Sequence, residues 1–484
     1  MISFLTALAV LIGGYFIYGL LVDKVIGTTA STPMPAYTKT DGVDYMPMAT
    51  WRVFLIQFLN IAGLGPIFGA IMGVMFGPAA FLWIVLGTIF AGAVHDFLSG
   101  VISIRMGGAS LPEIVGAELG TGVKQVMRGF SVVLLVLVGA VFVLTPADLL
   151  AGMTPSWLDR SVWIAVILGY YLLATLLPID KVIGNLYPVF GFALLFMAVA
   201  LLGFLLFGDT VIPDGFGEGL HNRFAGNQAD HPVFPLMFVS IACGAISGFH
   251  ATQSPMMARC LKNEKLARPI FYGAMVTEGL VALIWAAAAI AFTGGYEQLS
   301  AYMAEHGNSA GALVKDISYT WLGTVGGVLA VLGVIAAPIS TGDTALRSAR
   351  LIVADFMGMS QATFFRRLLI CIPLFAAAFG QMLIDFNVLW RYFAWSNQTL
   401  AVFTLWAVTV YLARHRKAYV VALVPAMFMT IVSVSYLLFA RRPEGFGLDL
   451  DIAVGVGMAV AGIFLAMFSF WLRGRSRSVV GQTR

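Results

Sequence analysis

The sequence at residues 243–255 is Cys-Gly-Ala-Ile-Ser-Gly-Phe-His-Ala-Thr-Gln-Ser-Pro, within an apolar segment, 233–257, long enough to cross a membrane. A second such segment, 51–76, is interrupted by Ala-Gly-Leu-Gly-Pro at 62–66. Unwound backbone is tolerated at membrane depth only where it is buried in protein or lines a hydrated cavity. A pair of interrupted spans therefore predicts a transporter whose binding site lies at the two interruptions.

The composition excludes a soluble domain. Hydrophobic residues make up 60% of the chain and charged residues 11%, and the mean hydropathy is +0.91. A soluble domain has roughly 25% charged residues. The net charge of +4 is small and the basic residues are dispersed, so the sequence predicts no nucleic-acid partner. The three cysteines are far apart and predict neither a disulfide framework nor a metal site.

Thirteen apolar segments are long enough to cross a bilayer. They are 2–22, 51–76, 79–104, 130–152, 161–178, 184–207, 233–256, 270–293, 321–342, 366–385, 390–412, 418–439 and 452–472. With the N-terminus outside, 22 of the 28 Lys and Arg residues, Lys181 and Arg484 among them, fall on the inner side. Because inner loops are enriched in Lys and Arg, we predict an outer N-terminus and a cytoplasmic C-terminus.

The positions of the two interrupted segments predict an internal repeat. Four uninterrupted segments follow the first interrupted one before the second begins, so each repeat has five helices. Five is odd, so the second repeat enters the membrane from the opposite side. The predicted units are an extra helix and cytoplasmic loop (1–50), the first repeat (51–207), an outer loop (208–232), the inverted second repeat (233–412), and two extra helices with a basic tail (413–484). The alternative is that the glycines only permit close helix packing.

Five blocks of sequence resemble one family. They are Asp-Gly-Val-Asp-Tyr-Met-Pro at 41–47, Gly-Ala-Val-His-Asp-Phe at 92–97, the stretch at 243–255, Ile-Ser-Thr-Gly-Asp-Thr-Ala-Leu-Arg-Ser-Ala-Arg at 339–350, and Trp-Arg-Tyr-Phe-Ala-Trp-Ser-Asn-Gln-Thr-Leu-Ala at 390–401. In this order they resemble the carbon starvation protein A family. The resemblance implies an inner-membrane transporter related to the amino acid–polyamine–organocation superfamily, with the leucine-transporter-like five-plus-five fold. Family members take up pyruvate or short peptides under carbon limitation, with protons. The chain departs from them at Gln57, where one or two His are usual nearby.

Two carboxylic acids, Asp96 and Glu278, lie inside apolar segments. A charge at the bilayer centre costs about 3 kcal/mol, so each acid is a candidate functional residue. Each lies in the second helix of its repeat, and His95 adjoins Asp96. Three residues suited to close helix contact share the face of Asp96: Thr88, Gly92 and Gly100. We predict that one acid carries protons and the other is structural. The alternative is that Asp96 only fixes an unwound segment by hydrogen bonding.

The interruptions supply the predicted substrate site. A half-helix N-terminus presents free N–H groups and a positive dipole end to a carboxylate. Histidine, the residue at position 250, is the side chain type whose unperturbed pKa lies near physiological pH. Asn397 and Gln398 add polar groups from a later span. The predicted substrate-binding residues are Gly63, Leu64, Gly65, Pro66, Ser247, Gly248, Phe249, His250, Thr252, Gln253, Asn397 and Gln398.

The coupling ion stays open between H⁺ and Na⁺. In the fold that the resemblance implies, hydroxyls at the end of a helix, here Ser340 and Thr341, hold Na⁺ together with carbonyls of the first interrupted helix. The alternative is an ordinary helix end, with Asp343 and Arg347 as a local ion pair. The predicted ion-coupling residues are His95, Asp96, Glu278, Ser340, Thr341 and Asp343.

The predicted function is secondary active import of a small carboxylate-bearing nutrient, with H⁺ as coupling ion. The alternatives are a Na⁺-coupled amino-acid or peptide symporter and, in another class, a membrane-embedded enzyme or a channel. The chain contains no HExxH, GxSxG or GxxxxGK[ST] pattern, so we predict no enzymatic activity, no cofactor and no ATP-driven step. His and Asp in the loop 208–232 are irregularly spaced, so we assign no metal there.

Overall fold

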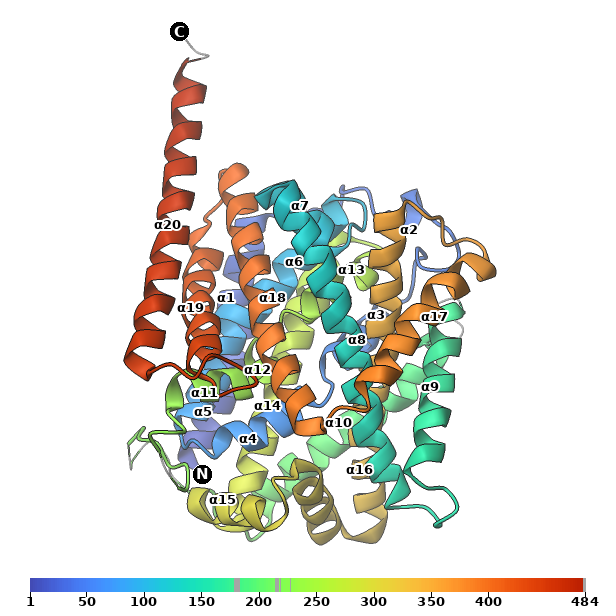
Figure 1. Cartoon of the computed structure of the whole chain (residues 1–484), viewed down its shortest axis with the longest axis vertical. Coiled ribbons are helices and arrows are strands. Elements are labelled where there is room, and N and C mark those ends of the chain that lie inside the picture. Colours follow the sequence, from blue (N-terminus) through green and yellow to red (C-terminus); the bar gives the residue numbers. More distant parts are fainter. Residues whose placement is uncertain (178–182, 214–216, 218, 227, 482–484) are drawn as a thin grey trace.

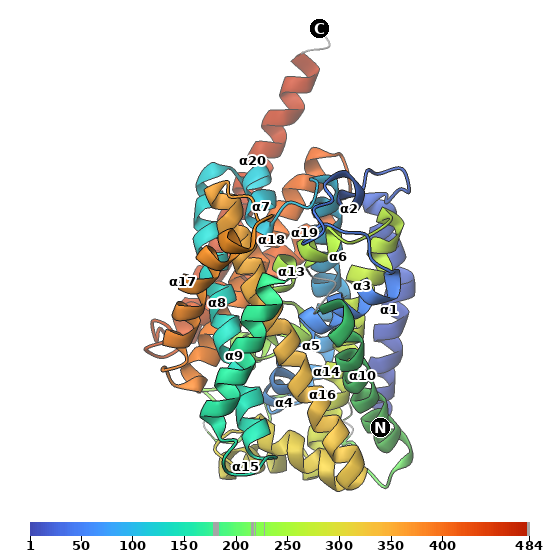
Figure 2. The ribbon, with the colours of Figure 1, turned by 90° about the vertical axis from the view of Figure 1, so that its right-hand side faces the viewer.

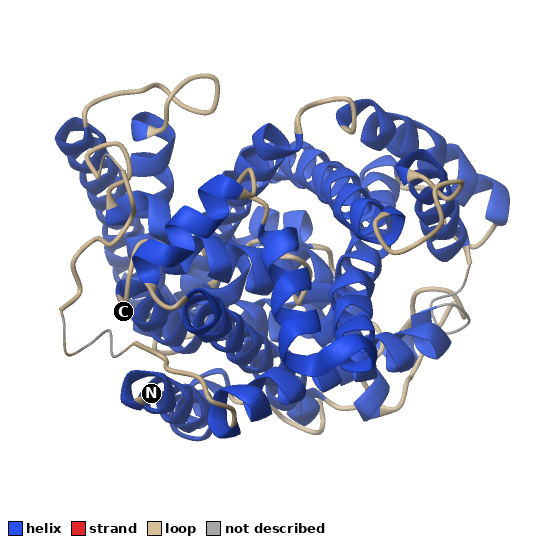
Figure 3. Cartoon of the chain, turned by 90° about the horizontal axis from the view of Figure 1, so that it is seen from below, coloured by secondary structure: helices blue, strands red, loops and turns tan. Residues whose placement is uncertain are grey.

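The computed structural model describes residues 1–177, 183–213, 217, 219–226 and 228–481, and all regular elements in these residues are helices (Figure 1, Figure 3). The α-helices are α1 Ile2–Ile26, α2 Pro35–Thr38, α3 Thr50–Ile61, α4 Ala70–Val74, α5 Ala79–Gly87, α6 Ala93–Arg105, α7 Leu111–Leu119, α8 Thr121–Ala151, α9 Arg160–Leu176, α10 Ile183–Phe207, α11 Val233–Ser240, α12 Ala242–Ala245, α13 His250–Ala258, α14 Gly273–Thr293, α15 Tyr296–Glu305, α16 Ala310–Met357, α17 Phe364–Gln381, α18 Phe386–Arg414, α19 Val420–Phe439 and α20 Leu450–Gly481. Short π- or 3₁₀-helical turns are η1 Gly65–Gly69, η2 Thr88–Gly92, η3 Glu264–Leu266 and η4 Arg268–Tyr272.

The chain is a multi-pass membrane protein. Among the described residues, nine helices are long and apolar enough to cross a membrane, or ten if the bent pair α3 and η1–α4 counts as one span. Each of the thirteen predicted segments coincides with a helix or a run of helices, but the count of thirteen spans and the inverted repeat stay predictions. Lys181, Arg484 and parts of the outer loop (214–216, 218, 227) lie outside the described residues.

The helices form one bundle with the chain ends at opposite poles (Figure 1). The long helix α16 packs along α8 and α10 (Figure 2). The first helix, α1, packs against α5 and α14, and α19 and α20 pack one after the other outside α18. The segments predicted as additions to the repeats therefore lie around the helices that hold the interruptions. Which pole faces the cytoplasm stays a prediction.

The long helix α16 corrects one prediction. The polar residues at 340–343 predict a helix end, but α16 continues past Asp343 to Met357, and its C-cap residue Gly358 has a left-handed φ of 61°. Arg347 and Arg350 lie in this continuation and are fully buried. They can be buried because both pair with the carboxylate of Asp44. The polar run is therefore interior helix.

Candidate functional site

Both predicted interruptions are present. In the first, Ala62 leaves the helical conformation (φ −79°, ψ 53°) and the axis turns by 54° between α3 and η1–α4. In the second, α11 ends at Ser240, α12 is a single turn, and Ile246 is fully extended (φ −159°, ψ 134°) before α13 starts at His250. The breaks lie where the glycine, proline and polar residues predict them.

The two interruptions contact each other through glycine. A Cβ atom added to Gly65 would overlap the side chain of Cys243, and one added to Gly69 would lie 2.7 Å from the carbonyl oxygen of Ser240. Small residues allow helix backbones in a membrane to approach this closely. The glycines at the first interruption are therefore required by contact with the second.

We expect Gly65→Ala to destabilise the protein by about 1–3 kcal/mol, because the added methyl group overpacks the contact with Cys243. Thermal unfolding in detergent measures the loss. Gly169→Ala in α9 is the control, since no atom lies within 4 Å of its added Cβ. Equal stability of the two variants would contradict the contact.

Asn397 and Gln398 of α18 hold the second interruption in place. The backbone N–H of Gly248 donates to the carbonyl oxygen of Asn397 (3.0 Å), and that of Phe249 donates to Asn397 Oδ1 (3.2 Å). Gln398 Nε2 donates to the carbonyl oxygen of Ile246 (3.3 Å). We predicted that free backbone N–H groups at this break would bind a carboxylate, but those of Gly248 and Phe249 already donate to Asn397. A ligand that accepts from these N–H groups must therefore displace Asn397.

The helix face around Asp96 lies against the same interruption. Thr88 Oγ1 donates to the carbonyl oxygen of Gly244 (3.1 Å), and a Cβ on Gly92 would overlap the carbonyl oxygen of Ala245. The predicted close helix contact is therefore present, and it brings Asp96 next to the break.

Four predicted residues form one buried chain of ionisable groups. His95 Nδ1 lies 2.7 Å from Asp96 Oδ1, and His250 Nδ1 lies 3.0 Å from Asp96 Oδ2. The other ring nitrogen of His250, Nε2, lies 3.6 Å from Glu278 Oε2. All four side chains are fully buried. Sequence reasoning found each of them separately, and the structure joins residues of α6, α13 and α14.

Asp96 and Glu278 differ in their surroundings. Each oxygen of Asp96 has a histidine nitrogen within hydrogen-bond distance. Among the described residues, neither oxygen of Glu278 has a hydrogen-bond partner. Asp96 is therefore held by two neighbours, whereas Glu278 is free to gain or lose a proton without breaking a hydrogen bond.

Two buried polar residues on α3 were missed by the sequence analysis as site residues. Gln57 and Asn60 are fully buried, and within the described residues no side-chain nitrogen or oxygen of either one has a hydrogen-bond partner. In the second interruption Ser247 Oγ and Gln253 Oε1 likewise have no hydrogen-bond partner among the described residues. The i, i+3 spacing of Gln57 and Asn60, one turn before a break, is the sequence signal that could have found them.

The hydroxyls predicted for Na⁺ do meet the first interrupted helix. Ser340 Oγ and Thr341 Oγ1 donate to the carbonyl oxygen of Leu59, at 3.2 and 3.0 Å. Leu59 lies in the last turn of α3, before the break. Hydroxyl and carbonyl oxygens are ligands that a hard cation accepts.

The ion pair between Asp343 and Arg347, considered as the alternative to a cation site, does not form. Asp343 accepts hydrogen bonds from the hydroxyls of Tyr170 (2.7 Å) and Tyr187 (2.6 Å). Arg347 instead pairs with Asp44 (2.9 Å). The two phenols satisfy both carboxylate oxygens of Asp343, and the guanidinium finds its counter-charge on another segment.

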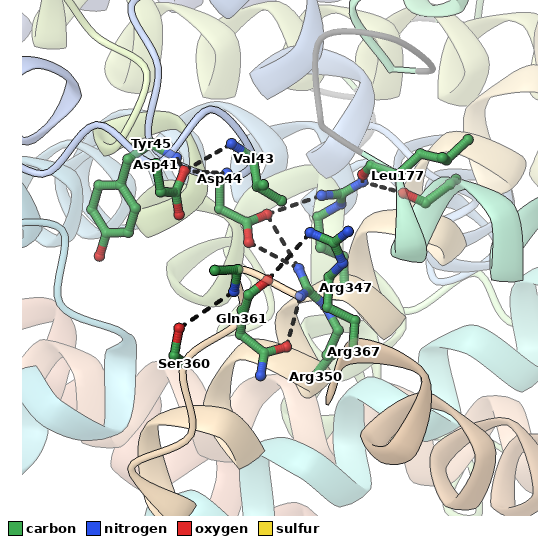
Figure 4. Close-up of polar contacts among 12 residues, drawn as sticks. Asp41, Val43, Asp44, Tyr45, Leu177, Arg347, Arg350, Ser360, Gln361 and Arg367 are labelled. Atoms are coloured by element: carbon green, nitrogen blue, oxygen red, sulfur yellow. Dashed lines mark hydrogen bonds and ion pairs between the residues drawn. The ribbon is translucent and has the colours of Figure 1, made fainter. Parts of the chain in front are cut away.

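A buried ion cluster lies at the pole near the C-terminus, and its polar contacts are drawn in Figure 4. Arg347 Nη1 and Arg350 Nη2 donate to Asp44 at 2.9 and 3.0 Å. Arg350 Nη1 also donates to Gln361 Oε1 (2.8 Å), and Arg367 Nη1 donates to the carbonyl oxygen of Gln361 (3.2 Å). Burial alone would raise the pKa of the Asp44 carboxyl, but the nearby guanidinium groups of Arg350 and Arg347 hold its pKa well below the usual range.

A cavity of about 930 Å³ opens at the opposite pole. Its lining includes Met72 of α4, Ser240 of α11 and Trp390 of α18. At its rim Arg391 and Glu444 form an ion pair (2.6 Å). The cavity thus reaches the halves of both interrupted spans that lie on the N-terminal side of the molecule.

The site combines three features of a membrane transporter. They are two interrupted spans in contact, a buried chain of ionisable groups beside them and a cavity that leads toward them. The sequence comparisons agree. The family model described as carbon starvation protein CstA matches residues 1–200 and 154–325, and the chain belongs to this family. Those of its relatives whose names state a function are named as transporters and not as enzymes.

Three relatives illustrate the range. An uncharacterized membrane protein of Haemophilus influenzae is 46% identical over 340 residues, 60% of this chain and 91% of its own length. The peptide transporter CstA of Campylobacter jejuni is 26% identical over 550 residues, 87% of this chain and 77% of its own. The pyruvate/proton symporter BtsT of Escherichia coli is 27% identical over 338 residues, 57% of this chain and 47% of its own.

Proposed function

We propose that the chain is a secondary active transporter that imports a small carboxylate-bearing nutrient, pyruvate or a short peptide, together with protons across the inner membrane. The observation that carries the proposal is the chain His95–Asp96–His250–Glu278, which runs from one repeat to the interruption in the other. Relatives named as a peptide transporter and as a pyruvate/proton symporter support both substrate classes and the proton.

Glu278 is the proposed proton carrier, and Asp96 the structural acid. A buried carboxyl without a partner favours its neutral form, and a nearby cation favours the charged one. Because His250 lies between the two acids, it can pass a change of charge at Glu278 to the first turn of α13. Substrate bound at the interruption and the proton on Glu278 then influence each other through His250.

The two poles fit the import direction. In the predicted orientation the 930 Å³ cavity opens outside, and the cluster of Asp44, Arg347 and Arg350 closes the cytoplasmic side. Transport then requires that this cluster separate while the outer cavity closes. The charge-paired end of α16 is the proposed cytoplasmic gate.

Sodium is the second candidate for the coupling ion. The convergence of Ser340 and Thr341 on the Leu59 carbonyl supports it, because this arrangement places three oxygens near the end of α3. Uptake that requires Na⁺ and is lost in Thr341→Ala would replace the proton proposal.

Counterflow exchange in proteoliposomes tests the proposed site. We expect His250→Ala and Gln253→Ala to reduce exchange at least tenfold, since each removes a polar group at the second interruption (the loss of one such group costs about 1–3 kcal/mol). His306→Ala, on the exposed end of α15, is the matched control. Wild-type exchange by both site variants would place the substrate elsewhere, and product formation in place of exchange would indicate an enzyme.

A further inference from the structure

The carboxylate of Asp44 lies in a site that is built by other segments of the chain. Arg347 Nη1 donates to its Oδ1 (2.9 Å), and Arg350 Nη2 contacts both Oδ1 (3.2 Å) and Oδ2 (3.0 Å). Figure 4 shows the carboxylate between the two guanidinium groups. Guanidinium groups that contact both oxygens are a usual means by which proteins bind a free carboxylate.

The two arginines are also held in place by other contacts. Both lie on α16, one turn apart. Arg347 Nη2 donates to the carbonyl oxygen of Leu177 (2.8 Å), and Arg350 Nη1 donates to Gln361 Oε1 (2.8 Å). The two guanidinium groups therefore do not depend on Asp44 alone for their positions, and the site is preorganised for a carboxylate.

The cluster holds more positive than negative charge. Within the described residues, the ion pairs of Arg347 and Arg350 are both with Asp44, so one carboxylate faces two fully buried guanidinium groups. The buried guanidinium group of Arg367 adds a third positive charge to the cluster. A buried charge is costly unless it is paired. The cluster therefore cannot release Asp44 unless another anion takes its place.

The segment that carries Asp44 can leave as a unit. It is the irregular stretch 39–49, between α2 and α3. Three successive backbone N–H groups in it donate to Asp41 Oδ1 (2.8, 2.9 and 2.9 Å), so the turn keeps its shape by its own hydrogen bonds. The N–H of Met48 links it to the carbonyl oxygen of Cys260, just after α13 (3.1 Å). A compact turn thus presents its carboxylate to two arginines on a long helix.

We propose that Arg347 and Arg350 form a binding site for a free carboxylate, that Asp44 occupies this site as an internal ligand, and that the carboxylate of the transported nutrient replaces it during release. The cluster adjoins the second interruption, since Ser348 Oγ donates to the carbonyl oxygen of Thr252 (3.3 Å). Exchange of one carboxylate for another opens this pole without leaving the buried arginines unpaired. The role of the nutrient rests on the proposed function, whereas the carboxylate site itself does not.

Rescue of Asp44→Ala by sodium acetate tests the site. The variant loses the internal ligand and keeps both guanidinium groups, so acetate should bind between them and stabilise the folded protein. We expect saturating acetate to restore about half or more of the lost unfolding temperature in detergent. Sodium chloride at the same concentration should not, and Asp451→Ala on the exposed start of α20 should not respond to acetate. No rescue, equal rescue by chloride, or rescue that persists when Arg350→Met is added would overturn the site.

The wild-type protein supplies a second measurement that needs no variant to fold. Cys260 is fully buried, and its sulfur lies 4.0 Å from the carbonyl oxygen of Asp44. Acetate that displaces Asp44 should loosen this contact and speed the alkylation of Cys260 by a maleimide severalfold, as measured by mass spectrometry. Cys243, at the interruptions, is the internal control, and its rate should not rise. A rate at Cys260 that acetate leaves unchanged would overturn the site.

Exchange measured from each face of the membrane distinguishes the nutrient from other carboxylates in the cytoplasm. For Asp44→Asn combined with Arg350→Met, we expect the half-saturating substrate concentration to rise about tenfold in inside-out vesicles, because a charged hydrogen-bonding partner is lost. It should stay close to wild type in right-side-out vesicles. Wild-type values from both faces would overturn the role of the nutrient. If no compound is exchanged at all, the proposed function fails, while the acetate measurements still decide the site.

Discussion

Glu278→Gln is expected to abolish uphill accumulation of substrate while counterflow exchange stays close to wild type. Glutamine has the shape of the protonated acid but cannot release a proton, so the carrier still binds and moves substrate without using the proton gradient. Asp96→Asn is expected to impair both activities. Asp96 holds His95 and His250, so its loss disturbs the first turn of α13 as well as the chain of ionisable groups.

Proteoliposomes with an imposed pH gradient separate these outcomes. Accumulation is measured with the gradient and exchange without it, for both variants and for Glu297→Gln on the exposed face of α15 as control. The expected loss of accumulation is complete for Glu278→Gln, with uptake only to the equilibrium level. If both acid variants still accumulate substrate in a pH-dependent way, the proton chain is not the coupling path.

The fold was largely predictable because a membrane restricts the choices. Backbone in lipid must bond to itself, so apolar length alone locates most helices. The interruptions were visible because Gly65, Pro66 and the polar run at 247–254 contradict a continuous helix. Register with distant segments is not visible in this way. No sequence pattern near Asp343 indicates that Tyr170 and Tyr187 donate hydrogen bonds to it. The neighbouring Arg347 was therefore considered as its ion-pair partner, whereas Arg347 pairs with Asp44.

The site was predictable in its members but not in its connections. His95, Asp96, His250 and Glu278 each stood out by the cost of burying an ionisable group. That His250 bridges the two acids depends on how α13 packs against α6 and brings His250 near Glu278 of α14, which no local pattern encodes. Gln57 was not predicted as a site residue because an uncharged amide costs less free energy to bury than a charged group. It is recognised as a candidate only from the structure, where its side-chain amide has no hydrogen-bond partner among the described residues.

The ion cluster of Asp44, Arg347 and Arg350, at the pole that we predict to face the cytoplasm, gives the largest expected effect on stability. Asp44→Asn removes the carboxylate between Arg347 and Arg350, both fully buried. Removal of one partner of a buried pair leaves an uncompensated charge and costs about 3–5 kcal/mol. We expect a clear drop in the thermal unfolding temperature in detergent. Asp451→Asn, an exposed carboxylate at the start of α20, is the control and should cost less than about 1 kcal/mol.

The pH dependence of this loss distinguishes a charge effect from lost packing. Burial alone would raise the pKa of Asp44, but Arg350 and Arg347 hold it well below its usual range. A carboxyl whose pKa is lowered by folding stabilises the protein above its unfolded pKa of about 3.9, and this stabilisation is lost as the pH falls toward the folded pKa. The gap in unfolding temperature between wild type and Asp44→Asn should therefore stay constant from about pH 8 to pH 5 and narrow only below about pH 4. Replacement of Arg350 by Met in the Asp44→Asn background should recover part of the loss, because it removes one of the unpaired charges. A gap that does not respond to acid or to Arg350→Met would show that Asp44 acts through shape and not through its charge.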